Sequence, residues 1–407
     1  MAFDFAPLLA PGIPAPAVKW PGWPKYNFTF GNNAPEEVPI DDLRAAVDKV
    51  LAREGRRLAE YRLEQGPQGY RPLREFLVKK LKQDAAIDCT IDDLLIVSGS
   101  LQGLDLINGA LLAPGDTVIC ERDNYEGTLN RFTRRGVNAV PIPLDPDGMR
   151  MDALGAELAA LKRKGIRPKF IYTIATVQNP TGTILSLDRR KKLLALAEEY
   201  GVPIVEDDCY ADLTWDGERP PAIYSLSKSQ NVIHVGSFSK TIAPALRLGF
   251  VVAPWAILSR LLALKTDAGT GGLEQMMLAE YCEAHFTGHV KELRQRFRAK
   301  LDTLVAALNE QFGTAAEFDY PPGGIFLWVK LPDNVDTMRL REVAREAGVL
   351  INPGSEWSVD KEHSRCRMRL CFASPSHEEI REGIALLADL CRREFGVPAR
   401  SGNVERS

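Results

Sequence analysis

Short apolar runs alternate with amphipathic stretches through much of this chain. The apolar runs lie at 94–97, 117–120, 170–174, 202–205, 232–235 and 248–252. Between them, apolar residues recur at helical spacing from 104 to 112 and from 187 to 200. Strands that are apolar on both faces and that alternate with helices indicate a mostly parallel sheet buried between layers of helices.

The last part of the chain has a different pattern. A long helix is expected near 278–308, whereas 325–329 and 367–372 alternate like strands with one buried face. We therefore predict an α/β fold, with a large domain built on the parallel sheet and a smaller α+β C-terminal domain. The predicted boundaries are residues 1–30 for a proline-rich N-terminal arm, 46–300 for the large domain, and 31–45 with 301–407 for the small domain. A chain of 407 residues exceeds what one hydrophobic core usually holds, which also favours two domains.

Composition and charge narrow the class of protein. The chain is 45% hydrophobic and 26% charged, with a net charge of -3, so nothing indicates nucleic acid or a membrane surface as a partner. No apolar run reaches eighteen residues, and the arm, broken by prolines, does not resemble a signal peptide. The seven cysteines form no C-x-x-C pair, which favours a reducing compartment, and we predict the cytoplasm. The histidines do not cluster like metal ligands, so no metal site is predicted.

Groups with cofactor chemistry follow several of the apolar runs. Lys240 ends the run Ser-Phe-Ser-Lys at 237–240, and Arg247 follows seven residues later. Upstream lie Asn-Pro-Thr-Gly at 179–182 and Glu-Asp-Asp-Cys-Tyr at 206–210. Ligands of open parallel sheets bind at the carboxyl ends of the strands, so an amine, a carboxylate, a phenol and an amide are expected at one edge of the sheet.

These motifs, in this order and at these spacings, resemble those of the class I aminotransferase family of fold-type I pyridoxal 5'-phosphate (PLP) enzymes. Within the family they are most similar to the branch of 2-aminoadipate, kynurenine and aromatic aminotransferases. The resemblance runs from about residue 30 to residue 372. It implies a homodimeric enzyme that uses PLP to move an amino group from an L-amino acid to a 2-oxo acid such as 2-oxoglutarate.

The resemblance also implies a role for each matching residue. Lys240 would bind the aldehyde cofactor covalently and move protons during the reaction. Asp207 would pair with the pyridine nitrogen and keep it protonated, with Asp208 as the neighbouring alternative. Tyr210 and Asn179 would donate hydrogen bonds to the 3-oxygen of the cofactor.

A phosphate-binding site is expected at 98–103, where Ser-Gly-Ser-Leu-Gln-Gly follows a strand and opens a helix. The phosphate contacts that the resemblance implies come from Ser100, the N–H of Leu101, Ser237, Ser239 and Arg247. Tyr125 would stack on the cofactor ring, an arrangement worth about 1 kcal/mol.

Recognition of the substrate carboxylate calls for an arginine, whose two N–H groups can bind both oxygens. Arg367 and Arg369 alternate onto the same strand face, so strand register does not choose between them. The resemblance favours Arg369. It also implies that Asn179 contacts the substrate and that Gly31 lets the backbone approach the same carboxylate.

One position departs from the family pattern. Relatives commonly carry a tyrosine five residues before the glycine of the run Gln68-Gly69-Tyr70, and this tyrosine reaches the phosphate bound by the partner subunit. Here that position is Glu64, whose charge would repel a phosphate. Either Tyr61 or Gln65 substitutes, the loop is shifted, or the contact is lost. A glycine-rich stretch at 267–272 has no explanation in the sequence.

Other functions are compatible with the same groups. PLP makes every bond at Cα labile, so a decarboxylase, a β-lyase, a racemase or an oxidase is an alternative to an aminotransferase. A PLP-binding transcription regulator is a further alternative, although only a short arm precedes the core here. Trp20, Trp23 and Tyr26 of that arm would line a pocket that tolerates aromatic substrates.

Overall fold

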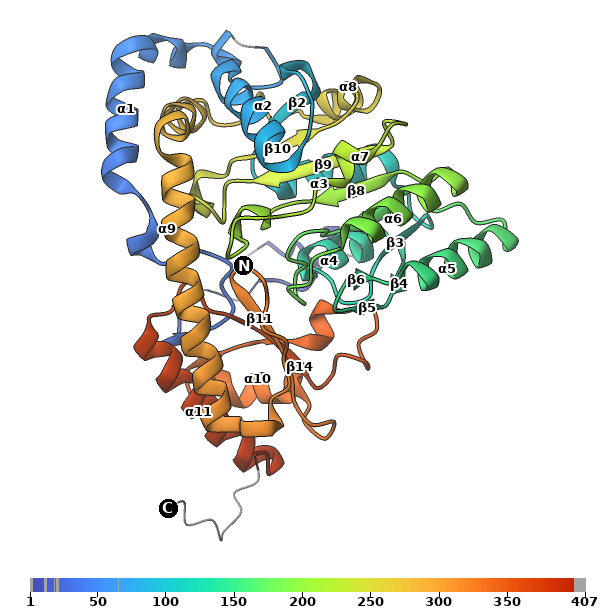
Figure 1. Cartoon of the computed structure of the whole chain (residues 1–407), viewed down its shortest axis with the longest axis vertical. Helices are drawn as coiled ribbons and strands as arrows, with labels where there is room; N and C mark the ends of the chain where they lie inside the picture. The colour runs from blue at the N-terminus through green and yellow to red at the C-terminus, as the bar shows by residue number, and fades with distance from the viewer. Residues whose placement is uncertain (1–2, 11–12, 18, 20–21, 65, 399–407) are drawn as a thin grey trace.

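The computed structural model describes residues 3–10, 13–17, 19, 22–64 and 66–398, although the side chains of Arg62 and Glu64 are outside this description (Figure 1). A seven-stranded sheet forms the centre of the large domain. Its strands, in spatial order, are β2 (Leu94–Val97), β10 (Gly249–Val252), β9 (Val232–Ser237), β8 (Ile204–Asp207), β7 (Ile171–Thr173), β3 (Thr117–Glu121) and β4 (Asn138–Ile142). All neighbouring pairs are parallel except those of β10, which runs antiparallel to both β2 and β9.

The antiparallel strand follows from the length of one connection. Residues 238–248 join β9 to β10 and include only one turn of 3-10 helix, η7 (Pro244–Leu246). A parallel return needs a crossover of a dozen or more residues, usually with an α-helix. The chain after Lys240 therefore turns back directly and pairs antiparallel.

Helices cover both faces of the sheet because alternate residues of each strand point to opposite faces. One face packs against α3 (Ser100–Leu111), α4 (Glu126–Arg134) and α8 (Trp255–Leu264). The other face packs against α5 (Met151–Arg163), α6 (Leu187–Tyr200) and α7 (Ile223–Leu226) on one side, and against α1 (Ile40–Glu54) and α2 (Arg71–Ala85) on the other. The fold is therefore the predicted α/β class with a mostly parallel sheet flanked by helices.

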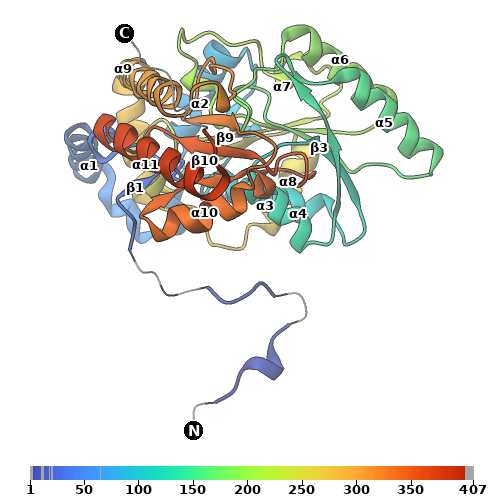
Figure 2. The same cartoon turned by 90° about the horizontal axis from the view of Figure 1, so that it is seen from below.

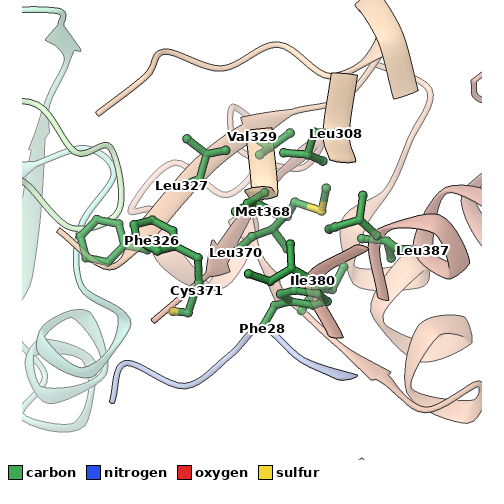
Figure 3. Packing of buried hydrophobic residues seen from close by; sticks show 14 of the residues in the cluster. Phe28, Leu308, Phe326, Leu327, Val329, Met368, Leu370, Cys371, Ile380 and Leu387 are labelled. Atoms are coloured by element: carbon green, nitrogen blue, oxygen red, sulfur yellow. The ribbon is translucent and has the colours of Figure 1, made fainter. Parts of the chain in front are cut away.

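A small domain packs below the carboxyl edge of this sheet (Figure 1). Its three-stranded antiparallel sheet has the order β11 (Phe326–Lys330), β14 (Arg367–Cys371) and β13 (Asn352–Pro353). Helices α10 (Thr337–Glu346) and α11 (His377–Phe395) accompany it, and β1 (Tyr26–Asn27) pairs with β12 (Val349–Leu350) beside it. Figure 3 shows Phe28, Met368, Leu370 and Ile380 meeting in the core of this domain.

Helix α9 (Gly272–Phe312) belongs to both domains. Its buried residues up to Val290 join the core around α1 and α2, whereas those from Leu293 onward join the core of the small domain. The sequence predicted this helix at 278–308, a little shorter than the 41 residues it spans.

The remaining elements are short. A hairpin pairs β5 (Leu144–Asp145) with β6 (Gly148–Met149). The 3-10 turns besides η7 are η1 (Ala6–Leu8), η2 (Pro35–Glu37), η3 (Gly55–Ala59), η4 (Tyr61–Glu64), η5 (Ile91–Asp93), η6 (Ala211–Leu213), η8 (Gly313–Ala315) and η9 (Gly354–Trp357). Among the described residues, no helix is long and apolar enough to span a membrane.

The described parts of the N-terminal arm extend away from the body of the molecule (Figure 2). Phe3, Phe5 and Leu8 are exposed there, and Trp23 contacts Phe30 edge to face with 4.4 Å between ring centroids. Trp20, which the sequence placed beside a substrate pocket, lies outside the described residues.

Candidate active site

A cavity of about 380 Å³ lies at the carboxyl edge of the central sheet, where the small domain faces it. The structure brings all of the candidate site residues to its wall. They are Gly31, Ser100, Leu101, Tyr125, Asn179, Asp207, Tyr210, Ser237, Ser239, Lys240, Arg247 and Arg369. The wall also holds residues that the sequence did not indicate, which are Thr29, Glu126, Ile174, Cys209, Pro244, Asn352 and Trp357. Trp23 and Tyr26 of the arm are not among the described residues that line it.

Lys240 enters the cavity from the loop that follows β9. Its Nζ donates a hydrogen bond to the carbonyl oxygen of Gly31. A Cβ on residue 31 would lie 3.2 Å from this nitrogen, so the glycine allows the close approach. Burial lowers the pKa of Lys240, and the charges of Arg369 and Arg247 lower it further. The amine is therefore easier to deprotonate than an exposed lysine.

Asp207 ends β8 and is almost fully buried. The hydroxyl of Tyr172 donates to its Oδ2 at 2.7 Å, whereas its Oδ1 has no hydrogen-bond partner. Burial and the charge of Asp208 raise the pKa of Asp207, although the hydrogen bonds from Cys209 and Tyr172 oppose the shift. A buried carboxylate oxygen without a partner is costly, so it marks a place where a donor can bind.

Asp208 points elsewhere and does not line the cavity. It forms a buried ion pair with Arg219 and lies 3.7 Å from His234 Nε2. Glu206 faces the same way and accepts the N–H of Ile223 at 2.8 Å. Burial alone would raise the pKa of Glu206, but the hydrogen bond and charge of His234 lower it to about 2. Of the three acidic residues, only Asp207 therefore faces the cavity. Glu206 and Asp208 point to the opposite face of the sheet, where they contact the start of α7 and Arg219.

Asn179 joins the two halves of the cavity wall. Its Nδ2 donates to the hydroxyl of Tyr210 at 3.3 Å, and its Oδ1 accepts from Arg369 Nη1 at 3.0 Å. Because Arg369 comes from β14 of the small domain, this side chain connects the phenol on one domain with the guanidinium on the other.

The start of α3 and Arg247 form the positive end of the cavity. Gly99 has a φ of +78° just before the helix, and a Cβ there would lie 2.3 Å from Arg247 Nη2. The same nitrogen donates to the carbonyl of Ser98 at 3.4 Å. Free N–H groups at a helix start beside a guanidinium form a site suited to a phosphate.

Arg369 is held from several sides. Its Nη2 donates to the carbonyl of Thr29 at 3.1 Å, and its guanidinium carbon lies 3.8 Å from the centre of the Trp357 ring. Its Nε is buried without a partner. Arg367, two residues away on the same strand face, does not line the cavity. Position along the strand, which alternation cannot reveal, distinguishes the two arginines.

Tyr125 is positioned by a buried carboxylate that the sequence did not indicate. Glu121, at the end of β3, accepts a hydrogen bond from Asn124 Nδ2 at 2.7 Å, and Asn124 Oδ1 accepts the N–H of Tyr125 at 2.7 Å. Burial raises the pKa of Glu121 to about 7, against the hydrogen bonds from Thr173 and Asn124. The strand end therefore fixes the loop that presents the tyrosine.

The first residue of the glycine-rich stretch at 267–272 connects it to the start of α3. Asp267 accepts hydrogen bonds from Lys265 at 2.6 Å and from Gln102 Nε2 at 2.7 Å. Gln102 Oε1 in turn accepts the N–H of Ser98 at 2.7 Å. The stretch thus supports the loop that opens α3.

Glu64 occupies the position that departs from the family pattern. Of the two residues that could substitute there, Tyr61 is 84% exposed and Gln65 lies outside the described residues.

A lysine, a carboxylate, a phenol, an amide and the start of a helix thus lie together at the carboxyl edge of an α/β sheet. A family model for class I and II aminotransferases matches residues 24–387, so the chain belongs to this family. It is 32% identical over 368 residues to aromatic-amino-acid aminotransferase 1 of Thermococcus litoralis, covering 90% of this chain and 87% of the relative. It is also 32% identical over 367 residues to the 2-aminoadipate transaminase of Thermus thermophilus, covering 89% and 88%.

Solved structures agree with the fold. The multiple substrate aminotransferase from Thermococcus profundus superposes with a TM-score of 0.87 at 32% identity, covering 97% of this chain and all of that one. Family and relatives together make this chain an enzyme, an aminotransferase, as the sequence predicted.

Proposed function

We propose that this aminotransferase uses PLP to move an amino group from an L-amino acid to a 2-oxo acid such as 2-oxoglutarate. The observation that carries the proposal is the placement of Lys240 and of the unpartnered oxygen of Asp207 in one cavity. These are the two groups that a PLP enzyme needs at the aldehyde and at the ring nitrogen of the cofactor.

The cavity residues fit PLP by their chemistry. Asp207 Oδ1 is a buried acceptor that would pair with a protonated ring nitrogen, and the start of α3 with Arg247 would bind the phosphate. Ser100, Ser237 and Ser239 would add hydroxyl donors to the phosphate, and the N–H of Leu101 would complete this set. Tyr125 would pack on the ring, and Tyr210 with Asn179 would donate to its 3-oxygen.

Bound PLP supplies an electron sink for the charge that develops when a bond at the substrate Cα breaks. Lys240 acts as the base that takes the Cα proton and returns a proton one step later, a role for which its lowered pKa prepares the amine. Arg369 binds the substrate carboxylate together with Asn179. Because Gly31 has no side chain, its backbone can approach the same carboxylate. The carboxylate of Asp207 would pair with the pyridine nitrogen of the cofactor and keep that nitrogen protonated.

Relatives with names that specify aromatic amino acids and 2-aminoadipate support these substrate classes for the donor. A homodimer with sites at the subunit interface also belongs to the proposal. So does a division into an arm at 1–30, a large domain at 46–300 and a small domain at 31–45 with 301–407, although the change of core along α9 falls between Val290 and Leu293, before the proposed boundary. The cytoplasmic location stays a prediction from the cysteine content.

The visible spectrum of the PLP-loaded protein tests the reaction. An L-amino acid should bleach the absorption band of the bound cofactor, and 2-oxoglutarate or another 2-oxo acid should restore it. A band that shifts with amino acids but never returns with any 2-oxo acid would instead indicate a decarboxylase, lyase, racemase or oxidase. Absence of a band after incubation with PLP would overturn the proposed cofactor.

A lysine variant tests the mechanism separately. Lys240→Ala should lower kcat by at least about 10³-fold because the variant loses both the covalent attachment and the base. Lys228→Ala, which removes an exposed lysine, is the matched control and should keep wild-type turnover. Turnover by Lys240→Ala within tenfold of wild type, with the circular dichroism of the folded protein, would contradict the mechanism.

A further inference from the structure

A chain of two buried hydroxyl groups ends on the carboxylate of Asp207. The hydroxyl of Tyr172, in the middle of β7, donates to Asp207 Oδ2 at 2.7 Å, and Thr128 Oγ1 of α4 donates to that hydroxyl at 3.2 Å. Tyr172 and Thr128 are each 1% exposed, and neither is among the described residues that line the cavity. The two hydroxyls therefore reach Asp207 from within the protein core, where water does not compete for their hydrogen bonds.

The surroundings of Tyr172 keep its hydroxyl protonated and fix the ring. Burial raises the pKa of this phenol well above its usual range, and the charge of Asp207 raises it further. The ring meets the ring of Phe132 edge to face, with 6.3 Å between the centroids and 84° between the planes. Near neutral pH the phenol therefore donates to the carboxylate in one fixed direction.

The hydrogen bond from Tyr172 determines which oxygen of Asp207 is free. It occupies Oδ2, whereas Oδ1 has no hydrogen-bond partner among the described residues. Burial and the charge of Asp208 raise the pKa of Asp207, against the hydrogen bonds from Cys209 and Tyr172 and the charge of His234. Of the two hydrogen-bond donors, the phenol is the stronger, because a thiol donates weakly. Tyr172 thus favours the charged form of Asp207 and leaves one oxygen for a further donor.

One turn of α4 connects this chain to another residue of the cavity. Tyr125 lies directly before the helix and lines the cavity, and the N–H of Thr128 donates to its carbonyl oxygen at 2.9 Å. In the proposed function Tyr125 packs on the face of the cofactor ring, whereas Asp207 pairs with the ring nitrogen. The start of α4 therefore fixes the stacking residue and the first hydroxyl of the chain relative to each other.

We propose that Tyr172 is a positioning residue, which together with Thr128 orients Asp207 and holds it as a carboxylate for the ring nitrogen of the cofactor. This inference rests on the proposed function, because it explains how the partner of that nitrogen is prepared. Without the phenol, the buried carboxyl group keeps its own proton more often, and a protonated ring nitrogen loses part of its counter-charge. Tyr172 itself touches neither substrate nor cofactor.

Binding of PLP to the apoprotein tests the inference without requiring turnover. Tyr172→Phe should raise the dissociation constant of PLP about tenfold, the value of one hydrogen bond to a charged group. Thr128→Val removes the hydroxyl and keeps the shape of the side chain. It should raise the constant by about threefold, because the phenol then donates more weakly. Quenching of tryptophan fluorescence by PLP measures both constants.

The absorption band of the bound cofactor provides a second readout, which a loss of packing alone would not move. A positive charge on the ring nitrogen disfavours protonation of the nitrogen that joins the cofactor to Lys240. Tyr172→Phe weakens that positive charge, so the midpoint of the pH titration of the band should rise by about half a pH unit. The midpoint of Thr128→Val should lie between those of the wild type and Tyr172→Phe.

Tyr281→Phe is the matched control. Tyr281 is also 1% exposed, its hydroxyl has no hydrogen-bond partner among the described residues, and it does not line the cavity. This variant should keep the wild-type affinity for PLP and the wild-type midpoint.

Three results would overturn the inference. They are an unchanged affinity in Tyr172→Phe, a weaker affinity with an unmoved midpoint, and an equal change in Tyr281→Phe. If the wild type binds PLP and the variants shift as expected, but no amino acid exchanges its amino group with a 2-oxo acid, Tyr172 positions Asp207 as inferred and the proposed reaction is what fails.

Discussion

At the scale of the residue, the arginine pair on β14 shows how the environment of a side chain determines its role. Arg369 is buried against Trp357 and bonded to Asn179, whereas Arg367 lies away from the cavity. The guanidinium is fixed on one face by the indole ring and by carbonyl and amide oxygens at its edges. If Arg369 binds the substrate carboxylate as proposed, its guanidinium is already positioned for it, which lowers the entropic cost of binding.

We predict that Arg369→Ala weakens substrate binding far more than it slows chemistry. Truncating one partner of a buried charge pair costs about 3 kcal/mol, so KM for the best amino acid should rise roughly 100-fold. Arg367→Ala is the control and should change KM by less than about threefold. Steady-state kinetics of the two variants decides the assignment, and a larger effect of Arg367→Ala would transfer the role to that residue.

Polar site residues that lie at or just after the end of a buried strand could be predicted from the sequence. Lys240, Asp207 and Asn179 each follow an apolar run, and the rule for parallel sheets placed them at one edge. Tyr172 and Trp357 could not be found in this way. The first is part of an apolar strand, and the second ends the 3-10 turn η9, where its carbonyl accepts the N–H of Asn124 from a distant part of the chain.

At the scale of the element, strand β3 ends in a carboxylate that titrates near neutrality. Glu121 is buried and its pKa is raised to about 7 from the ordinary 4.5, so the folded protein binds its proton more tightly than the unfolded chain. The associated stability is present below pH 4.5 and is lost as the pH rises to about 7. By the linkage relation the loss is about 3 kcal/mol.

Glu121→Gln should remove this pH dependence, because the amide cannot ionise. The free energy of unfolding from urea titrations, measured at pH 5 and pH 8, should fall more in wild type than in the variant, by up to about 3 kcal/mol. Parallel pH profiles for the two proteins would show that the folded and unfolded states bind this proton equally.

Helix α9 offers a second prediction at this scale. Gly288 lies in its exposed middle, and a Cβ there would meet no atom within 4 Å. Gly288→Ala should therefore stabilise the protein by about 1 kcal/mol, the difference in helix propensity. Gly103→Ala in α3 is the contrasting variant, because its Cβ would lie 2.9 Å from Val251 Cγ2, and it should destabilise. Thermal unfolding midpoints that move together would contradict the prediction.

The elements themselves were largely predictable from apolar periodicity. Buried strands and long helices such as α9 have strong patterns, and their existence was correctly predicted. The antiparallel direction of β10 was not, because periodicity does not report direction. Only the length of the connection after Lys240 indicates it.

At the scale of the whole molecule, the exposed tyrosine of η4 provides a test of the proposed homodimer. Tyr61 is 84% exposed and lies one helical turn before Glu64, the position where the family resemblance leads us to expect a tyrosine that contacts the partner subunit. We predict a homodimer by analytical ultracentrifugation in which this hydroxyl contacts the phosphate bound by the second copy. Tyr61→Phe should then weaken PLP binding about tenfold, the value of one hydrogen bond to a charged group.

Tyr320→Phe is the control for this experiment, since Tyr320 is also partly exposed but donates to Asp302 on the small-domain side. Its PLP dissociation constant should match that of wild type. A monomer in solution, or equal PLP affinity in both variants, would show that Tyr61 does not replace the usual tyrosine. The sequence could not decide this point because the predicted contact would lie between chains.

The sharing of α9 between two cores also limits how this protein can be taken apart or recombined. A gene fragment that ends before Val290 or begins after Leu293 carries half of the helix without the core that the other half completes. Neither fragment should express as a folded module, and exchanges of the small domain between relatives should succeed only when all of α9 moves with its neighbours. Because α9 contributes to both cores, the two domains are expected to fold together and to be exchanged only together.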